Sequence, residues 1–178
     1  MALKATIFKA TLQIADLDRH YYRDHALTLA RHPSETDERM MVRLLAFALH
    51  AGEALTFTRG LSTGEEPDLW QKDLNGAIQT WIELGQPDAR RLRSVAGRAE
   101  RVLVYSYSGR SADIWWQQVR TAVAGIGNLS VRNLPAAAVR ELAGLVQRSM
   151  HLHCTIQDAQ VWIADDRHTV QVPVVSLE

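Results

Sequence analysis

The sequence predicts a mixed α/β protein that folds as one domain over residues 1–178. Segments in which apolar and polar residues alternate indicate strands, and segments with apolar residues every three or four positions indicate amphipathic helices. Strong turn signals, such as Asn75-Gly76, separate these segments. A chain of 178 residues is also long enough to bury one core without disulfides.

The first part of the chain predicts a hairpin and a helix. Alternation over residues 5–14 and 21–30 indicates two strands joined by a turn. A helix is expected from Ser34, as its N-cap, to about His50, because acidic residues fill its first turn and apolar residues recur at helical spacing. A short strand at 54–59 follows.

The middle of the chain predicts a hairpin followed by a strand–helix–strand unit. Strands are expected at 68–72 and 77–84, around the Asn-Gly turn. Pro87 suits the first turn of the next helix, and a buried strand at 101–107 follows. This spacing predicts that the strands on either side of the helix are parallel, with a right-handed crossover.

The remaining elements are expected to extend the core around one mixed sheet. They are helices at 112–124 and 135–147 and strands at 129–132, 150–156, 160–163 and 169–175.

Composition excludes several classes of protein. The 20 basic and 20 acidic residues give a formal net charge of zero, so nucleic acid would have to be bound by a local basic patch. Cys154 is the one cysteine, which excludes an intrachain disulfide and suits a reducing compartment. The N-terminus lacks the pattern of a signal peptide, and no apolar run is long enough to span a membrane. These observations predict a cytoplasmic protein.

Two carboxylates in the middle of the chain point to a metal-dependent reaction. From residue 34 to 108 the predicted order is helix, three strands, helix and strand, which is the order of the PD-(D/E)xK (restriction-endonuclease-like) nuclease core. Asp68 opens the second of these strands, and Glu83 lies in the third. Two carboxylates on adjacent strands can hold one Mg²⁺, or Mn²⁺, which phosphodiester cleavage uses to generate hydroxide and neutralise charge.

The same motif departs from its nuclease pattern at one residue. The lysine expected two positions after the second acid is replaced by Gly85. Lys72 or Gln86 could position the water or the phosphate instead, and Glu38 on the long helix is a candidate auxiliary acid. The alternative is that both acids are structural, since Pro-Asp is a common turn dipeptide.

A group of arginines follows the second acid. The predicted helix after Glu83 places Arg90, Arg91, Arg93 and Arg98 mostly on its exposed face, where a nucleic-acid backbone could lie. The alternative is a solvated helix face whose cations favour the C-terminal end of the helix.

Blocks along almost the whole chain resemble the YaeQ proteins of proteobacteria. The matching stretches are residues 1–7, 29–35, 57–60, 81–85, 114–118, 128–131 and 155–158. The resemblance implies a compact variant of the PD-(D/E)xK fold, in which Asp68 and Glu83 match the motif acids and the motif lysine is missing.

Three functional hypotheses follow. The first is a metal-dependent, nuclease-like protein that acts on nucleic-acid phosphodiesters. The second is a catalytically silent module of the same fold that binds nucleic acid or protein. The third is a protein-interaction role for the helix that carries Trp115 and Trp116, of which only one can face the core. A zinc site at His151 and His153 is disfavoured, because Cys154 points to the opposite face of the strand.

Overall fold

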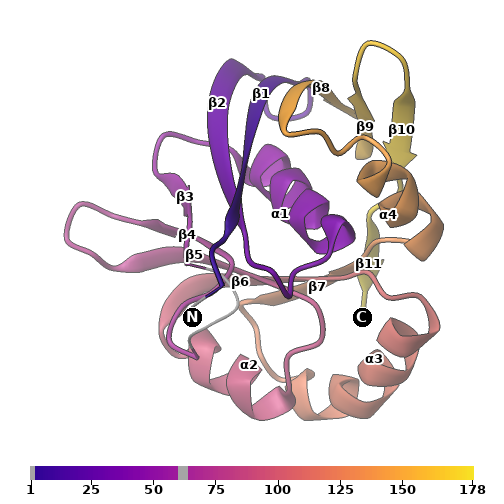
Figure 1. Cartoon of the computed structure of the whole chain (residues 1–178). Helices are drawn as coiled ribbons and strands as arrows, with labels where there is room; N and C mark the ends of the chain where they lie inside the picture. The colour runs from indigo at the N-terminus through magenta and orange to yellow at the C-terminus, as the bar shows by residue number, and fades with distance from the viewer. Residues whose placement is uncertain (1–2, 60–63) are drawn as a thin grey trace. The chain divides into compact units, whose positions relative to one another are not determined.

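A computed structural model describes residues 3–59 and 64–178, which contain four helices and eleven strands (Figure 1). In chain order the elements are β1 (Thr6–Asp16), β2 (Tyr21–Arg31), α1 (Asp37–His50), β3 (Leu55–Phe57), β4 (Leu69–Lys72), β5 (Ile78–Leu84), α2 (Ala89–Ala96), β6 (Ala99–Ser106), α3 (Arg110–Val123), β7 (Leu129–Asn133), α4 (Ala136–Ala143), β8 (Ser149–Gln157), β9 (Gln160–Ala164), β10 (Thr169–Val172) and β11 (Val175–Leu177). The described residues divide into two compact units.

The first unit comprises the chain up to Leu49 together with Ala137–Val174. Its five-stranded sheet has the order β10-β9-β8-β1-β2, and the long β1–β2 pair is antiparallel while β1 and β8 are parallel. Alternate residues of β1 are buried, so one face of the strand contributes to a core and the other meets solvent.

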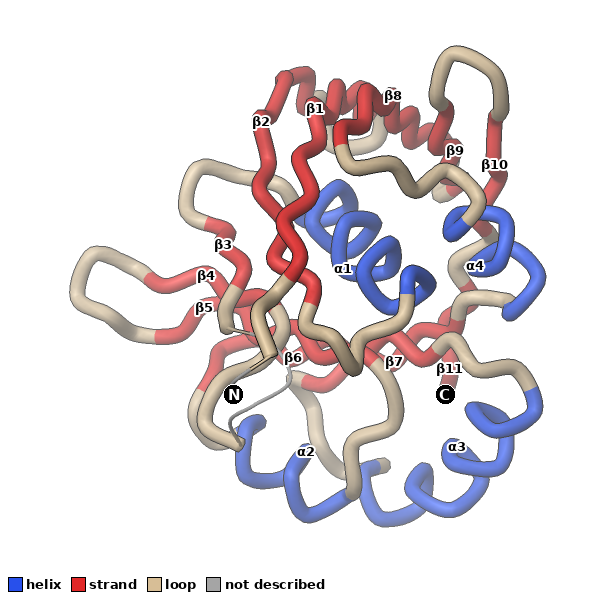
Figure 2. Tube along the Cα trace, viewed as in Figure 1, coloured by secondary structure: helices blue, strands red, loops and turns tan. Residues whose placement is uncertain are grey.

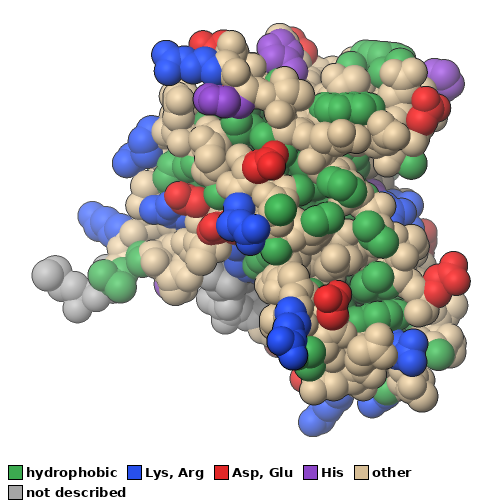
Figure 3. All heavy atoms as spheres, turned by 90° about the vertical axis from the view of Figure 1, so that its right-hand side faces the viewer, with side chains coloured by type: hydrophobic (Ala, Val, Ile, Leu, Met, Phe, Trp, Pro, Cys, Tyr) green, Lys and Arg blue, Asp and Glu red, His purple; other side chains and the backbone are tan. Residues whose placement is uncertain are grey.

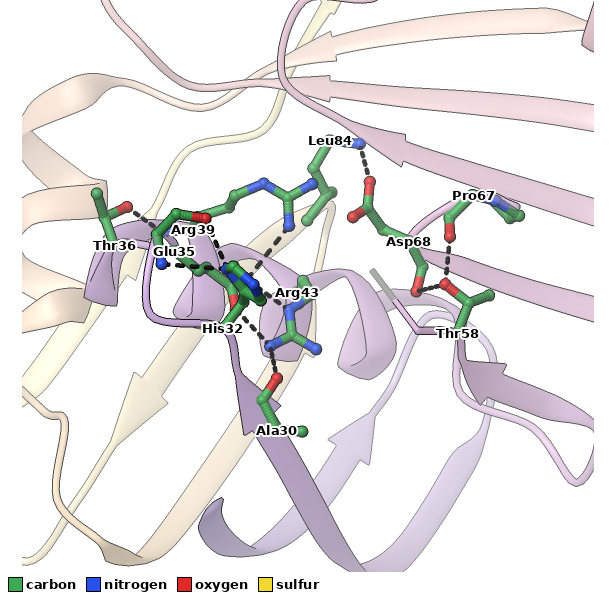
Figure 4. Close-up of polar contacts among 11 residues, drawn as sticks. Ala30, His32, Glu35, Thr36, Arg39, Arg43, Thr58, Pro67, Asp68 and Leu84 are labelled. Carbon is green, nitrogen blue, oxygen red and sulfur yellow. Dashed lines mark hydrogen bonds and ion pairs between the residues drawn. The ribbon is translucent and has the colours of Figure 1, made fainter. Parts of the chain in front are cut away.

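Helix α1 packs against the β1–β2 hairpin, although it is buried on almost every side. The ring of Phe47 meets that of His25 edge-on at 5.1 Å, and the guanidinium of Arg43 donates to the carbonyl of Ala30. Arg43 also forms two 2.8 Å hydrogen bonds to the Glu35 carboxylate, and Arg39 adds a third (Figure 4). This network neutralises the buried charge of Glu35.

The second unit comprises His50–Ala136 and Val175–Glu178, apart from residues 60–63. Its six-stranded sheet has the order β11-β7-β6-β5-β4-β3, with β5, β6 and β7 parallel and the outer strands antiparallel. Helices α2 and α3 lie side by side along one face of this sheet (Figure 2). The core between them consists mainly of Leu92, Val104, Trp115, Val119, Val123 and Val131.

The structure confirms most of the predicted elements of the middle third. The turn at 73–76 joins β4 to β5, with the Asp73 carboxylate accepting from two backbone N–H groups and Gly76 at φ +86°. Strands β5 and β6 are parallel, as the strand–helix–strand spacing predicts. Trp115 is a core residue and Trp116 is partly buried, which fits their adjacent places on one helix.

The expected single mixed sheet is wrong, because the strands form two sheets. The strand predicted at 169–175 ends at Val172, because Pro173 has no N–H to continue the ladder. The chain then forms β11, which pairs with β7 in the other unit's sheet. The one-domain prediction for residues 1–178 stays a prediction.

Three predicted helix ends also need correction. The N-cap of α1 is Thr36, whose hydroxyl accepts from Arg39 N, whereas the Ser34 hydroxyl contacts His32 Nδ1. The cap of α2 is Asp88, so Pro87 precedes this helix. Helix α4 ends at Ala143, four residues before the expected end, where Gly144 N–H bonds the carbonyl oxygens of Arg140 and Glu141.

Candidate acidic site

Backbone groups on two neighbouring segments hold Asp68, which lies just before β4. Its N–H donates to the carbonyl of Ile82 at 3.0 Å, and its carbonyl accepts from Thr58 N at 3.1 Å. The carboxylate oxygen Oδ2 accepts from Leu84 N at 2.9 Å (Figure 4). Because these bonds fix both the backbone and the side chain, the carboxylate has a defined position near the end of β5.

Glu83 lies near Asp68. The antiparallel ladder begins with Leu69 paired with Ile82, and Asp68, just before it, bonds Ile82 O through its N–H and Leu84 N–H through its carboxylate. These two bonds place Asp68 beside the strand segment that carries Glu83, and the charge of Asp68 acts on the Glu83 carboxyl. Both side chains are buried, at 6% relative exposure each. The structure therefore brings the two predicted acids together.

Burial and the neighbouring charges shift the pKa of Glu83. Burial raises the pKa of Glu83 above its ordinary value, and the neighbouring charge of Asp68 raises it further. Arg91 acts in the opposite direction, as a positive charge and as a hydrogen-bond donor. Perturbation of this kind by burial and a second carboxylate is typical of functional sites, although structural ion pairs also produce it.

Arg91 is a cation that bonds Glu83 of this pair. Its Nε donates to Glu83 Oε1, while its terminal nitrogens donate to the carbonyl oxygens of Gly64 at 2.6 Å and Glu66 at 3.2 Å. These bonds use three of the five guanidinium N–H groups. Arg91 reaches the pair because Asp88 caps α2 just after β5, which places the first turn of the helix above the strand end.

The other residues expected to replace the motif lysine lie elsewhere. Gly85 has φ +101° and open space where a Cβ would lie, so its backbone conformation, and not crowding, favours glycine. The side chain of Gln86 hydrogen-bonds the hydroxyl of Ser111. Lys72 Nζ lies 3.7 Å from the centroid of the Trp70 ring, four residues along β4 from Asp68.

The remaining predicted site residues are dispersed. Glu38 lies in the first turn of α1 and belongs to the first unit. Arg90 and Arg93 are exposed on α2, where Arg93 donates to the carbonyl of Ala122. Arg98 donates to the carbonyl of Glu65, and its guanidinium lies 5.2 Å from the Trp81 ring.

Charge is mixed on the face in Figure 3, where Lys and Arg side chains are scattered among Asp and Glu side chains. This agrees with the net charge of zero, so attraction of a polyanion would depend on a local group of cations.

The donor set fits a single Mg²⁺ held by few protein ligands. The buried oxygen Oε2 of Glu83 makes no hydrogen bond of standard geometry within the described residues, while the Trp81 side chain acts on this carboxyl as a donor that lowers its pKa. No group of three or more His, Cys, Asp or Glu side chains within 3–59 and 64–178 is arranged to hold an ion. Since Mg²⁺ keeps several waters and often binds through only two carboxylates, Asp68 and Glu83 meet its requirement.

Other motifs of the sequence have simpler structural roles. His151 and His153 are exposed on β8, while Cys154 is buried on the opposite face, as the alternation predicts.

None of the helices in the described part of the chain is long and apolar enough to cross a membrane.

Sequence reasoning missed the contact between Arg91 and Glu83. Arg91 was expected among arginines facing a nucleic-acid backbone, yet its side chain is only 27% exposed and turns toward β5. The signal that could have found it is the short connection 85–88, which starts α2 directly above the end of the strand.

A family model and individual relatives match the chain over almost its whole length. The family model described as YaeQ protein matches residues 1–174. The YaeQ proteins of Salmonella typhi and Escherichia coli (strain K12) are each 47% identical to the chain, over 176 and 172 residues. These alignments cover 99% and 97% of this chain and 97% and 95% of those proteins.

Two crystal structures share the fold. The YaeQ protein from Xanthomonas axonopodis pv. citri is 45% identical, with a TM-score of 0.95 and coverage of 98% of both chains. The YaeQ protein from Pseudomonas syringae is 38% identical, with a TM-score of 0.93 over 98% of this chain and 96% of that one.

Proposed function

Because this chain belongs to the YaeQ family, we propose that it is a metal-dependent, nuclease-like protein of the PD-(D/E)xK type that acts on nucleic-acid phosphodiesters in the cytoplasm. The observation that carries the proposal is the buried, cross-strand pair of carboxylates, Asp68 and Glu83, with Arg91 bonded to Glu83. Burying two like charges side by side is costly, and a cation held by both carboxylates would lower that cost further than the bond from Arg91 to Glu83 does.

Each residue has a distinct task in this proposal. Asp68 and Glu83 hold Mg²⁺ (or Mn²⁺), which when bound polarises the phosphodiester and lowers the pKa of a water molecule. Leu84 N–H orients the Asp68 carboxylate through Oδ2. Arg91 orients the Glu83 carboxylate and keeps two N–H groups outside its three described bonds, which can stabilise negative charge on the phosphate.

Arg91 takes over only part of what a lysine would do. A guanidinium stays protonated at all physiological pH values, so it can orient and stabilise anions but cannot accept a proton from water. Lys72 and Gln86 make their contacts with Trp70 and Ser111, so they are weaker candidates for positioning water. Glu38 remains a candidate auxiliary acid.

The second candidate function is a catalytically silent binding module of the same fold. The conformation of Gly85 favours it, because φ +101° at the lysine position disfavours any L side chain there. The bonds from Arg91 to the carbonyls of Gly64 and Glu66 also suit a purely structural clamp.

Calorimetric titration of Mg²⁺ and Mn²⁺ separates the two candidates. The double variant Asp68→Asn, Glu83→Gln keeps an acceptor oxygen for Leu84 N and for Arg91 but removes both charges. Glu100→Gln, on the exposed start of β6, is the matched control. We expect the wild type and the control to bind metal and the double variant not to bind.

Cleavage of labelled single-stranded and duplex oligonucleotides then tests the reaction. Activity that requires the metal and is lost in the double variant supports the nuclease. Absence of metal binding in the wild type, or equal binding by the double variant, would reject the nuclease in favour of the silent module.

A further inference from the structure

A row of aromatic and basic side chains continues from the acidic pair along β4. Trp70 lies two residues after Asp68 and is paired with Trp81, which lies two residues before Glu83 on β5. The two indoles meet edge-on, with centroids 6.2 Å apart. Lys72 covers the Trp70 ring, and Arg98 covers the Trp81 ring.

Only one of the two indoles can receive a ligand. Trp81 is fully buried under α2, in contact with Val95 and Val102. Trp70 is partly exposed, and the group over its ring is the flexible side chain of Lys72. The Trp70 face is therefore covered by a group that can move without disturbing the core.

The energies favour replacement of Lys72 by a nucleobase. A base stacked on an aromatic ring generally contributes more binding free energy than a cation–π contact at an exposed site does. An ammonium displaced from the ring would still find an anion, because each nucleotide brings a phosphate. Stacking on Trp70 and ion pairing by Lys72 are thus compatible.

We propose that this face of β4 binds single-stranded nucleic acid, with an unpaired base stacked on Trp70 and phosphates bound by Lys72 and Arg98. The inference rests on the proposed function, since it names the substrate class of that site. Trp70 lies two residues from Asp68, or about 7 Å along the strand. This distance is about two axial rises of about 3.4 Å in a stacked strand, which would bring the phosphodiester of a neighbouring nucleotide toward the acids.

The preference for single strands follows from the geometry of stacking. A base pair inside a duplex has both faces covered by its neighbours, so it cannot stack on Trp70 without being unpaired first. A duplex could approach Lys72 and Arg98 only through its backbone.

Binding of a labelled oligothymidylate, followed by fluorescence anisotropy in EDTA, tests the proposal. Trp70→Ala should weaken binding by about 5- to 150-fold, and Trp70→Phe should retain most of it because a ring remains. Lys72→Gln should lower the slope of log affinity against log salt by about 0.7, since one phosphate contact is lost. Lys9→Gln, an exposed lysine of β1, is the matched control and should keep the wild-type slope.

Three results would overturn the inference: no binding by the wild type, equal binding by Trp70→Ala, or equal competition by a duplex of the same sequence. If Trp70→Ala fails to fold, the salt slope of the exposed Lys72→Gln variant decides alone. Because EDTA removes divalent metal, this assay is independent of the calorimetric one. If the protein binds single strands but no metal, the nuclease proposal is rejected and the single-strand binding face is retained. If it binds metal but no single strands, the binding face is rejected and the nuclease proposal is retained.

Discussion

The bond between Arg91 and Glu83 predicts a measurable coupling free energy. Arg91→Met removes the ion-pair partner bonded to Oε1 of the Glu83 carboxylate, which is 7% exposed. Breaking a buried ion pair in this way costs about 3–5 kcal/mol. Because the Arg91 side chain is 27% exposed, we expect a cost near the lower end, about 3 kcal/mol.

The cost should be smaller once Glu83 is neutral. In a Glu83→Leu background, which offers Arg91 no acceptor, Arg91→Met removes the two bonds to the carbonyl oxygens of Gly64 and Glu66. At about 0.5–1 kcal/mol for each bond, the cost falls to about 1–2 kcal/mol. The double-mutant cycle should therefore give a coupling of about 1–2 kcal/mol.

Urea unfolding of the four proteins at neutral pH measures this coupling. Arg93→Met, an exposed arginine of the same helix, is the control and should change the free energy of unfolding by less than about 1 kcal/mol. Additivity within about 0.5 kcal/mol would refute the reasoning, because it would mean that Arg91 does not stabilise the charge of Glu83.

Four further predictions concern single residues. Gly85→Ala should lower the free energy of unfolding by about 1–2 kcal/mol because of its φ of +101°, whereas Gly125→Ala, also in open space but without a positive φ, should change it by less than about 1 kcal/mol in urea unfolding. Since burial raises the pKa of Glu83 above 4.5, the folded chain binds more protons than the unfolded chain between the two pKa values. Stability should then fall as pH rises through that window, and thermal unfolding of Glu83→Gln should lack this decline; an unchanged pH profile would contradict it. Burial raises the pKa of the Cys154 thiol to about 12, so a thiol reagent at mildly alkaline pH should label it only as fast as the protein opens. Arg43→Met should lower the free energy of unfolding by about 3–5 kcal/mol and more than Arg39→Met does, because Arg43 binds both Glu35 oxygens; equal effects in thermal unfolding would show that the second bond adds nothing.

The acidic pair could be predicted from the sequence as two acids on adjacent strands. The register of the hairpin could not, because a bulge between Gln71 and Lys72 shifts it. A regular ladder counted from the Asn-Gly turn would slip by one residue, and a one-residue slip moves a side chain to the other face of the sheet. The backbone irregularity, and not residue type, sets the register of β4 against the strand that carries Glu83.

The sequence pattern also does not predict that the strands are divided between two sheets. Residues 169–175 read as one apolar-alternating segment, and Pro173 marks a break without saying where the chain goes next. The pairing of β11 with β7 joins residues more than forty positions apart, and local patterns carry no such information. Local elements were therefore predicted better than their assembly.

Gly85, the position where the nuclease motif would have its lysine, and Arg91 are connected by the backbone at the end of β5. Gly85 N–H bonds the carbonyl of Tyr105, which holds the chain beside β6 while φ reaches +101° and the chain turns toward α2. A lysine at position 85 would be strained in the backbone conformation that leads into α2. The same conformation brings Arg91 of α2 close to Glu83. Under the proposed function, the cation of the site is therefore supplied by Arg91 of helix α2 and not by a lysine of the strand. This replacement changes the proton chemistry that the cation can perform. A site with a guanidinium in place of an amine can stabilise charge on a phosphate but cannot itself take a proton from water, so proton transfer depends on groups other than Arg91.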